Sequence, residues 1–126
     1  MTLYKKHTDL PVYQMAFGAA RDVFQLSKSF PKEETYSLTD QVRRSSRSVC
    51  ANIAEAWRKR RSEAFFISTL NISEAEAAET QVWIQFAVDC KYLTSEEARP
   101  LYAKYDEILA QLVHLIENPT QWILKK

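Results

Sequence analysis

The chain has 126 residues with one glycine, four prolines and a formal net charge of +1, which is the size of a single domain. So little glycine argues against hairpin-rich β folds and Gly-rich phosphate loops, and the near-neutral charge gives no general attraction to nucleic acid or membranes. No apolar run approaches the roughly 18 residues of a membrane-spanning helix, and the first residues lack the apolar stretch of a signal peptide. We therefore expect one cytoplasmic domain over residues 1–126, with no membrane partner.

The first predicted helix covers about residues 10–29. Asp9 suits a helix cap and Pro11 suits a first helical turn. Apolar residues then recur at the helical period, in a wide stripe that includes Val12, Met15, Ala16, Ala19, Ala20, Val23, Phe24 and Leu26. The helix should end at Phe30, because the residue before a proline is pushed out of the α region.

The second predicted helix covers about residues 36–60 and begins with a capping box that joins Ser37 and Asp40. Small residues beside its apolar stripe allow a neighbouring helix to approach closely. The segment ends in four consecutive cations, which suit the negative end of a helix dipole. The inward stripe is expected to be Leu38, Val42, Val49, Ile53 and Ala56.

The third and fourth predicted helices cover about residues 63–91 and 95–117. Ser62 is a plausible cap for the third. The fourth starts near Thr94 or Ser95, with Glu96 and Glu97 in its first turn. The candidate core of the third helix is Phe66, Leu70, Ala77, Val82, Trp83, Phe86, Ala87 and Cys90. The candidate core of the fourth is Leu101, Tyr105, Ile108, Leu112 and Leu115, widened by Leu109, Val113 and Ile116.

Short connections between these segments favour an all-α fold, an antiparallel up-down-up-down four-helix bundle with tails at residues 1–8 and 119–126. Cys50 and Cys90 would lie roughly 25 Å apart along its axis, too far for a disulfide, which needs Cα atoms within about 7 Å. We therefore interpret both cysteines as separate, small buried hydrophobic residues.

The turn between the second and third helices sets the register of that hairpin. If the turn is centred just after Arg61, facing residues have numbers that add to about 123. Arg47 then lies level with Glu76, and Arg44 lies level with Glu79. This register predicts ion pairs between the two helices.

A set of short motifs occurs in a fixed order along the chain. They are Leu10-Pro11-Val12-Tyr13-Gln14, Phe30-Pro31-Lys32-Glu33-Glu34, Gln41-Val42-Arg43-Arg44, Ser48, Asn52-Ile53-Ala54-Glu55, Glu76-Ala77-Ala78-Glu79-Thr80 with Trp83, and Tyr92-Leu93. From about Leu10 to Ile116 the chain resembles the bacterial four-helix-bundle proteins linked to 23S rRNA intervening sequences, also called S23 ribosomal proteins. The accessory proteins of diversity-generating retroelements are similar to this family.

The resemblance implies a four-helix bundle that assembles as a ring, typically a homopentamer. It implies no established activity. The retroelement relatives bind a reverse transcriptase and RNA through a basic surface, so RNA or an RNA-handling protein is an expected partner.

Seven cations fall within 19 residues and are opposed only by Glu55: Arg43, Arg44, Arg47, Arg58, Lys59, Arg60 and Arg61. Delocalised positive charge of this kind suits a row of phosphates, and Trp57, Phe65 and Phe66 could stack on unpaired bases. However, the segment 63–97 carries a net charge of −6, so the arginines could instead form ion pairs within or between subunits. The cluster from Arg58 to Arg61 has fewer acids nearby and is the better candidate for binding an anion.

Asn52 and Glu55 lie one turn apart on one face of the second helix, where Glu55 can reach Lys59 or Arg58. They could form a polar site at a subunit junction. Alternatively, they form a hydrogen-bonded polar layer that fixes the register of the helices.

Nothing in the sequence points to catalysis, a metal or a cofactor. A di-iron bundle needs a Glu-x-x-His motif on each of two helices, whereas His114 and Glu117 are a single pair in the reverse order. We expect a non-enzymatic adaptor or scaffold, with a purely structural or protein-binding assembly as the alternative.

The wide apolar stripes of the first and fourth helices predict self-association. A monomeric bundle buries one stripe per helix, so the surplus should be buried between subunits. We expect a homo-oligomer, and a pentamer from the family resemblance. Light scattering across micromolar concentrations checks this, and a monomeric mass would contradict it.

Overall fold

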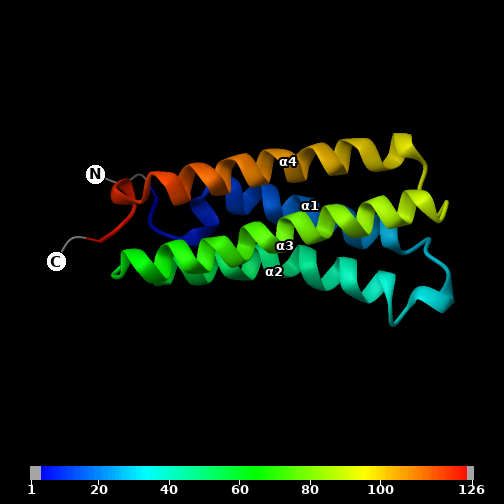
Figure 1. Cartoon of the computed structure of the whole chain (residues 1–126), viewed down its shortest axis with the longest axis horizontal. Coiled ribbons are helices and arrows are strands. Elements are labelled where there is room, and N and C mark those ends of the chain that lie inside the picture. Colours follow the sequence, from blue (N-terminus) through cyan, green and yellow to red (C-terminus); the bar gives the residue numbers. More distant parts are fainter. Residues whose placement is uncertain (1–3, 125–126) are drawn as a thin grey trace.

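The computed structural model describes residues 4–124 and contains four long helices: α1 (Pro11–Ser27), α2 (Leu38–Arg58), α3 (Glu63–Asp89) and α4 (Ser95–Glu117). Three short 3-10 helices accompany them: η1 (His7–Asp9), η2 (Lys32–Glu34) and η3 (Pro119–Gln121). The described part has no strand, so the predicted all-α four-helix fold is confirmed. The sequence colours run in opposite directions along successive helices (Figure 1).

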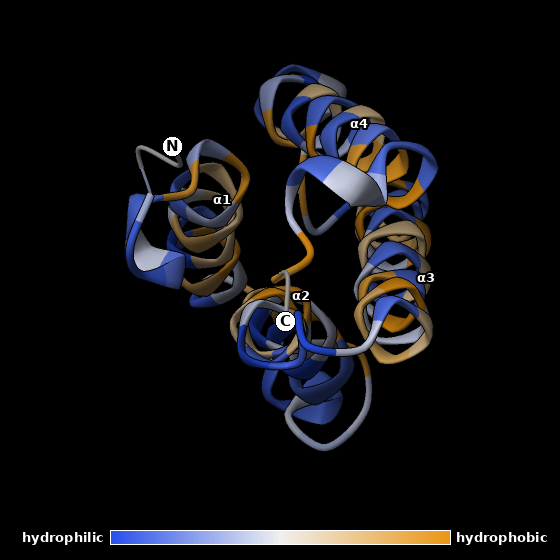
Figure 2. Cartoon of the chain, turned by 90° about the vertical axis from the view of Figure 1, so that its left-hand side faces the viewer, coloured by the Kyte–Doolittle hydropathy of each residue, from blue (hydrophilic) through white to orange (hydrophobic). Residues whose placement is uncertain are grey.

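The helices contact one another in a closed cycle. α1 packs against α2, α2 against α3, and α3 against α4, and α4 returns to α1. Figure 2 looks along the bundle and shows this order, with α1 and α3 on opposite sides. An ion pair of 2.6 Å between Lys104 Nζ and Asp22 Oδ2 joins α4 to α1.

α3 begins at the predicted cap, and α4 begins with a capping box that was not predicted. The Ser62 hydroxyl accepts the backbone N–H of Phe65 at 3.3 Å. At α4, Thr94 and Glu97 form a reciprocal capping box, because each side chain accepts the backbone N–H of the other residue. Both helices therefore begin within one residue of the expected position.

The starts of α1 and α2 do not follow the predicted capping chemistry. Asp9 does not cap α1, because its carboxylate accepts the backbone N–H groups of Lys5 and Lys6, which lowers the pKa of Asp9. Asp40 does not cap α2. Glu34 in η2 takes this role, since its carboxylate accepts the Leu38 N–H and the Ser37 hydroxyl.

The predicted stripes of α2 and α4 are buried, as are Val12, Ala16, Ala19 and Val23 of α1. The prediction for α3 was partly wrong: Val82, Phe86 and Cys90 are exposed, and Trp83 is only half-buried. α3 carries apolar residues of its own on all sides, so their spacing does not identify one face as the inward face. The surplus apolar residues of α1 and α4, such as Met15 and Leu109, are half-buried against the core.

Two buried hydrogen bonds fix the register of α2 and α3. The Ser73 hydroxyl donates to the Val49 carbonyl at 2.8 Å, and the Thr80 hydroxyl lies 2.8 Å from the Ser45 hydroxyl. The residue numbers of these pairs add to 122 and 125, close to the expected 123.

Both cysteines are free, as expected, but only Cys50 is buried. Cys90 is the C-cap residue of α3, where the helix ends and its side chain reaches solvent. Burial raises the pKa of the Cys50 thiol to about 11, so this thiol is protonated near neutral pH.

We expect the Cys90→Ser variant to resist thiol labelling in the native state. At pH 8 the Cys50 thiol is both buried and protonated, so a chromogenic aromatic disulfide should react only after urea unfolds the chain. In wild type, one thiol per chain should react in the native state and two should react in urea. Rapid native labelling of the variant would contradict the buried position of Cys50.

Candidate functional site

The first predicted cation, Arg43, is held between α1 and α2. Its Nε donates to the Ser27 hydroxyl at 2.8 Å, and its guanidinium carbon lies 4.7 Å from the centre of the Phe24 ring. The side chain is half-buried. Arg43 therefore joins two helices and is not available as a surface charge.

Arg44 and Arg47 are exposed and lie beside a polar groove between α2 and α3, with Glu76 and Glu79 on its other wall. The four residues therefore lie at matching heights along the two helices, as predicted, but the predicted ion pairs between them are not formed. Within residues 4–124 the only ion pairs are Lys59–Glu55 and Lys104–Asp22.

The reason lies in the surroundings of the four side chains. The Arg47 guanidinium faces α1, where it lies 5.7 Å from the Phe24 ring. Burial and the nearby Glu76 carboxylate raise the pKa of Glu79, and Arg44 only partly opposes this shift. Among residues 4–124, no cation is close enough to the two glutamates to form an ion pair with either of them.

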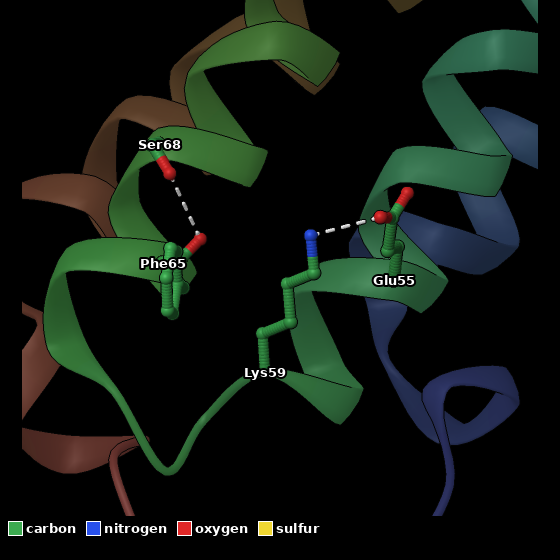
Figure 3. A network of polar contacts seen from close by, with 4 residues as sticks. All are labelled: Glu55, Lys59, Phe65 and Ser68. Atoms are coloured by element: carbon green, nitrogen blue, oxygen red, sulfur yellow. Dashed lines mark hydrogen bonds and ion pairs between the residues drawn. The ribbon is translucent and has the colours of Figure 1, made fainter.

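Asn52 and Glu55 do not form a common site in the chain. The Asn52 side-chain amide donates to the Ser48 carbonyl at 2.9 Å and to the Ser48 hydroxyl at 3.0 Å. The Glu55 carboxylate pairs with Lys59 Nζ at 2.9 Å, on the exposed surface near the end of α2 (Figure 3). Both residues bond within their own helix, so the expected layer that fixes the register of neighbouring helices is absent from the described residues.

The four cations at the end of α2 divide into two kinds. Lys59 is paired with Glu55, and Arg60 is packed on Trp57, with its guanidinium carbon 3.5 Å from the ring centre and its Nε donating to the Trp57 carbonyl at 2.7 Å. Burial and the neighbouring Arg58 lower the pKa of Arg60. Arg58 and Arg61 are exposed and have no ion pair or hydrogen bond to any residue in 4–124.

The chain termini add to this end of the bundle. The Trp57 indole N–H donates to the Lys5 carbonyl at 3.4 Å, which places the exposed Lys5 and Lys6 beside the end of α2. The Leu124 N–H donates to the Arg60 carbonyl at 3.0 Å. We call Lys5, Lys6 and the four cations from Arg58 to Arg61 the basic end; it lies at the left of Figure 1 and faces the viewer in Figure 2.

The sequence predicts residues 1–8 as a tail and therefore does not place Lys5 and Lys6 at this end of the bundle. The apolar residues near the C-terminus were the sequence feature that could have indicated that both terminal segments pack at this end of the bundle. Trp122 packs beside Trp57 and Tyr4, with ring centres 6.2 and 6.0 Å apart, and closes this end of the core.

The aromatic residues expected to stack on bases are mostly unavailable. Trp57 and Phe66 are buried in the core, and only Phe65, which is 62% exposed, reaches solvent beside the basic end. No group of three or more potential metal-ligating side chains occurs within residues 4–124. In the same range, no helix combines the length and the apolar character that crossing a membrane requires.

The chain matches a protein-family model and a solved structure. Residues 8–114 match the family model described as 23S rRNA-intervening sequence protein. A solved structure of a protein of unknown function from the S23 ribosomal protein family of Bacteroides thetaiotaomicron is 31% identical, with a TM-score of 0.75. This match covers 83% of the present chain and 97% of that one. Among curated proteins, none matches the chain significantly.

Arg43 and Arg44 offer a matched test of these assignments. Arg43→Ala should lower the free energy of unfolding by about 1–2 kcal/mol, because it removes a hydrogen bond and a cation–π contact between helices. Arg44→Ala should change it by no more than about 0.5 kcal/mol, since this side chain is exposed. Urea unfolding of the two variants measures the difference, and equal effects would contradict the structural role of Arg43.

Proposed function

Because the chain belongs to the 23S rRNA-intervening sequence protein family, we propose that it is a non-enzymatic homo-oligomeric adaptor of the cytoplasm that binds RNA through its basic end. The observation that carries the proposal is the position of six cations from two distant segments at one end of the bundle. Phosphates are recognised by clustered positive charge and need no enclosed pocket.

The free charges favour an external anion as the partner. Asp9 partly offsets Lys5 and Lys6, but Arg58 and Arg61 are exposed and have no partner among the described residues. A helix C-terminus by itself is balanced by fewer cations. In a ring of five copies the basic end would recur five times, so weak phosphate contacts would add through multivalency.

A salt-dependent binding measurement tests this proposal. Wild type should retain labelled single-stranded or hairpin RNA on filters at 50 mM salt. If four cations contact phosphates, a rise to 200 mM should weaken the binding of single-stranded RNA about 50-fold. The double variant Arg58→Glu with Arg61→Glu should lose detectable binding but keep the wild-type size-exclusion profile, because exposed charges there contribute only about 0–1 kcal/mol each to stability.

The matched control is Lys32→Glu with Arg99→Glu, which changes the net charge equally at the opposite end of the bundle. Its RNA affinity should stay within about twofold of wild type. Equal losses in both double variants would show a general charge effect and contradict a site at the basic end. If wild type fails to bind RNA at 50 mM salt, the alternative of a purely structural or protein-binding assembly is favoured.

A further inference from the structure

The exposed positions of α3 are uncharged over most of the helix. Every exposed residue between Ala64 and Phe86 is uncharged, and four of them are large and apolar: Phe65, Ile72, Val82 and Phe86, which are 41–62% exposed. In contrast, α4 carries seven exposed charged residues: Glu96, Glu97, Arg99, Lys104, Asp106, Glu107 and Glu117. The α3 face therefore differs from an ordinary solvated helix face.

The spacing along this face is that of a helix-packing seam. Alternate steps of three and four residues connect Phe65, Ser68, Ile72, Ala75, Glu79, Val82 and Phe86. We call these seven positions the α3 ridge. This repeat lets one helix lie along another for about 32 Å, and here it points away from the core of its own chain.

The same chain carries an apolar groove on another side. It lies between α1 and α2, where Phe17 and Phe24 form one wall and the small residues Ala20, Ala51 and Ala54 let a helix approach closely. In the end view of Figure 2, α1 and α3 lie on opposite sides of the bundle with α2 between them, so ridge and groove do not meet within one chain.

The borders of the two surfaces carry opposite charge. Glu74, Glu76 and Glu79 border the ridge or lie in it, and none of them forms an ion pair within residues 4–124, although Arg44 and Arg47 line the same groove as Glu76 and Glu79. Arg21 and Arg47 border the groove, with their guanidinium groups over Phe17 and Phe24. A second copy of this chain thus offers the ridge a surface of small residues, and it offers the glutamates two arginines of opposite charge.

The heights of the two surfaces also match. Because Ser73 bonds to the Val49 carbonyl, the middle of α3 lies level with the middle of α2. Two copies placed side by side with the same orientation would bring Ile72 of one against Ala51 of the other without an axial shift. α3 would then run antiparallel to the α2 that it contacts.

We propose that the α3 ridge of one copy packs into the α1–α2 groove of the next copy. Because the two surfaces differ, the contact is heterologous, and it generates a closed ring or an open filament, not a two-fold dimer. This inference deepens the proposed oligomeric adaptor and rests on its self-association. The ridge is thus assigned to a second copy of the chain, not to RNA or to an unrelated protein.

Three lysine substitutions at exposed positions test this contact. Ile72→Lys damages only the ridge, Ala51→Lys damages only the groove, and Gln85→Lys is the control at an exposed α3 position outside the ridge. Light scattering should give a monomeric mass for the first two at concentrations where wild type and the control are oligomers. Circular dichroism should show the same helix content for all four proteins.

Mixing the two damaged variants gives the sharpest outcome. The intact groove of Ile72→Lys can accept the intact ridge of Ala51→Lys, so an equimolar mixture should form 1:1 dimers and nothing larger. A mixture that stays monomeric, or an Ile72→Lys variant with the wild-type mass, would overturn the inference. A monomeric wild type would contradict the oligomeric adaptor itself, and RNA binding by the basic end would still be tested separately on filters.

Discussion

The close packing of α2 against α3 is the constraint on which the rest of the bundle depends. Small buried residues let the two backbones approach, and the hydroxyls of Ser73 and Thr80 find their partners on α2 at two heights. A slip of one helix turn would break both contacts and leave the buried Ser73 hydroxyl without its partner, which costs more than an ordinary hydrogen bond gains. The heights of the polar groove, the α3 ridge and the basic end all follow from this register.

Sequence periodicity predicted all four helices, but it predicted their caps only where the capping partners lie within one turn. Ser62 caps α3 as expected, because it and the N–H that it accepts lie within one turn. The cap of α2 was missed because Glu34 belongs to a preceding 3-10 helix, whose geometry no short motif specifies. Val82 and Phe86 were assigned to the core because α3 is apolar on all sides, and only its neighbours decide which side is inward.

The basic segment was recognisable from composition, but the division of its charges was not. Aromatic rings take up Arg43 and Arg60, and one of these rings lies on a different helix. Lys5 reaches the basic end through a bond to Trp57, which is 52 residues away in the sequence. Contacts of this kind depend on tertiary packing, so a count of charges along the chain cannot distinguish an arginine packed on an aromatic ring from an exposed, unpaired one.

The order of the helices around the bundle has a consequence for how the chain folds. α2 and α3 are joined by a short turn, whereas the seam between α1 and α4 brings together Asp22 and Lys104, which are 82 residues apart. Closing a long loop costs more conformational entropy than closing a short one, so the α2–α3 hairpin is the natural nucleus and the α1–α4 seam closes last. Weakening the seam should therefore speed unfolding and leave the refolding rate nearly unchanged, whereas weakening the hairpin should slow refolding.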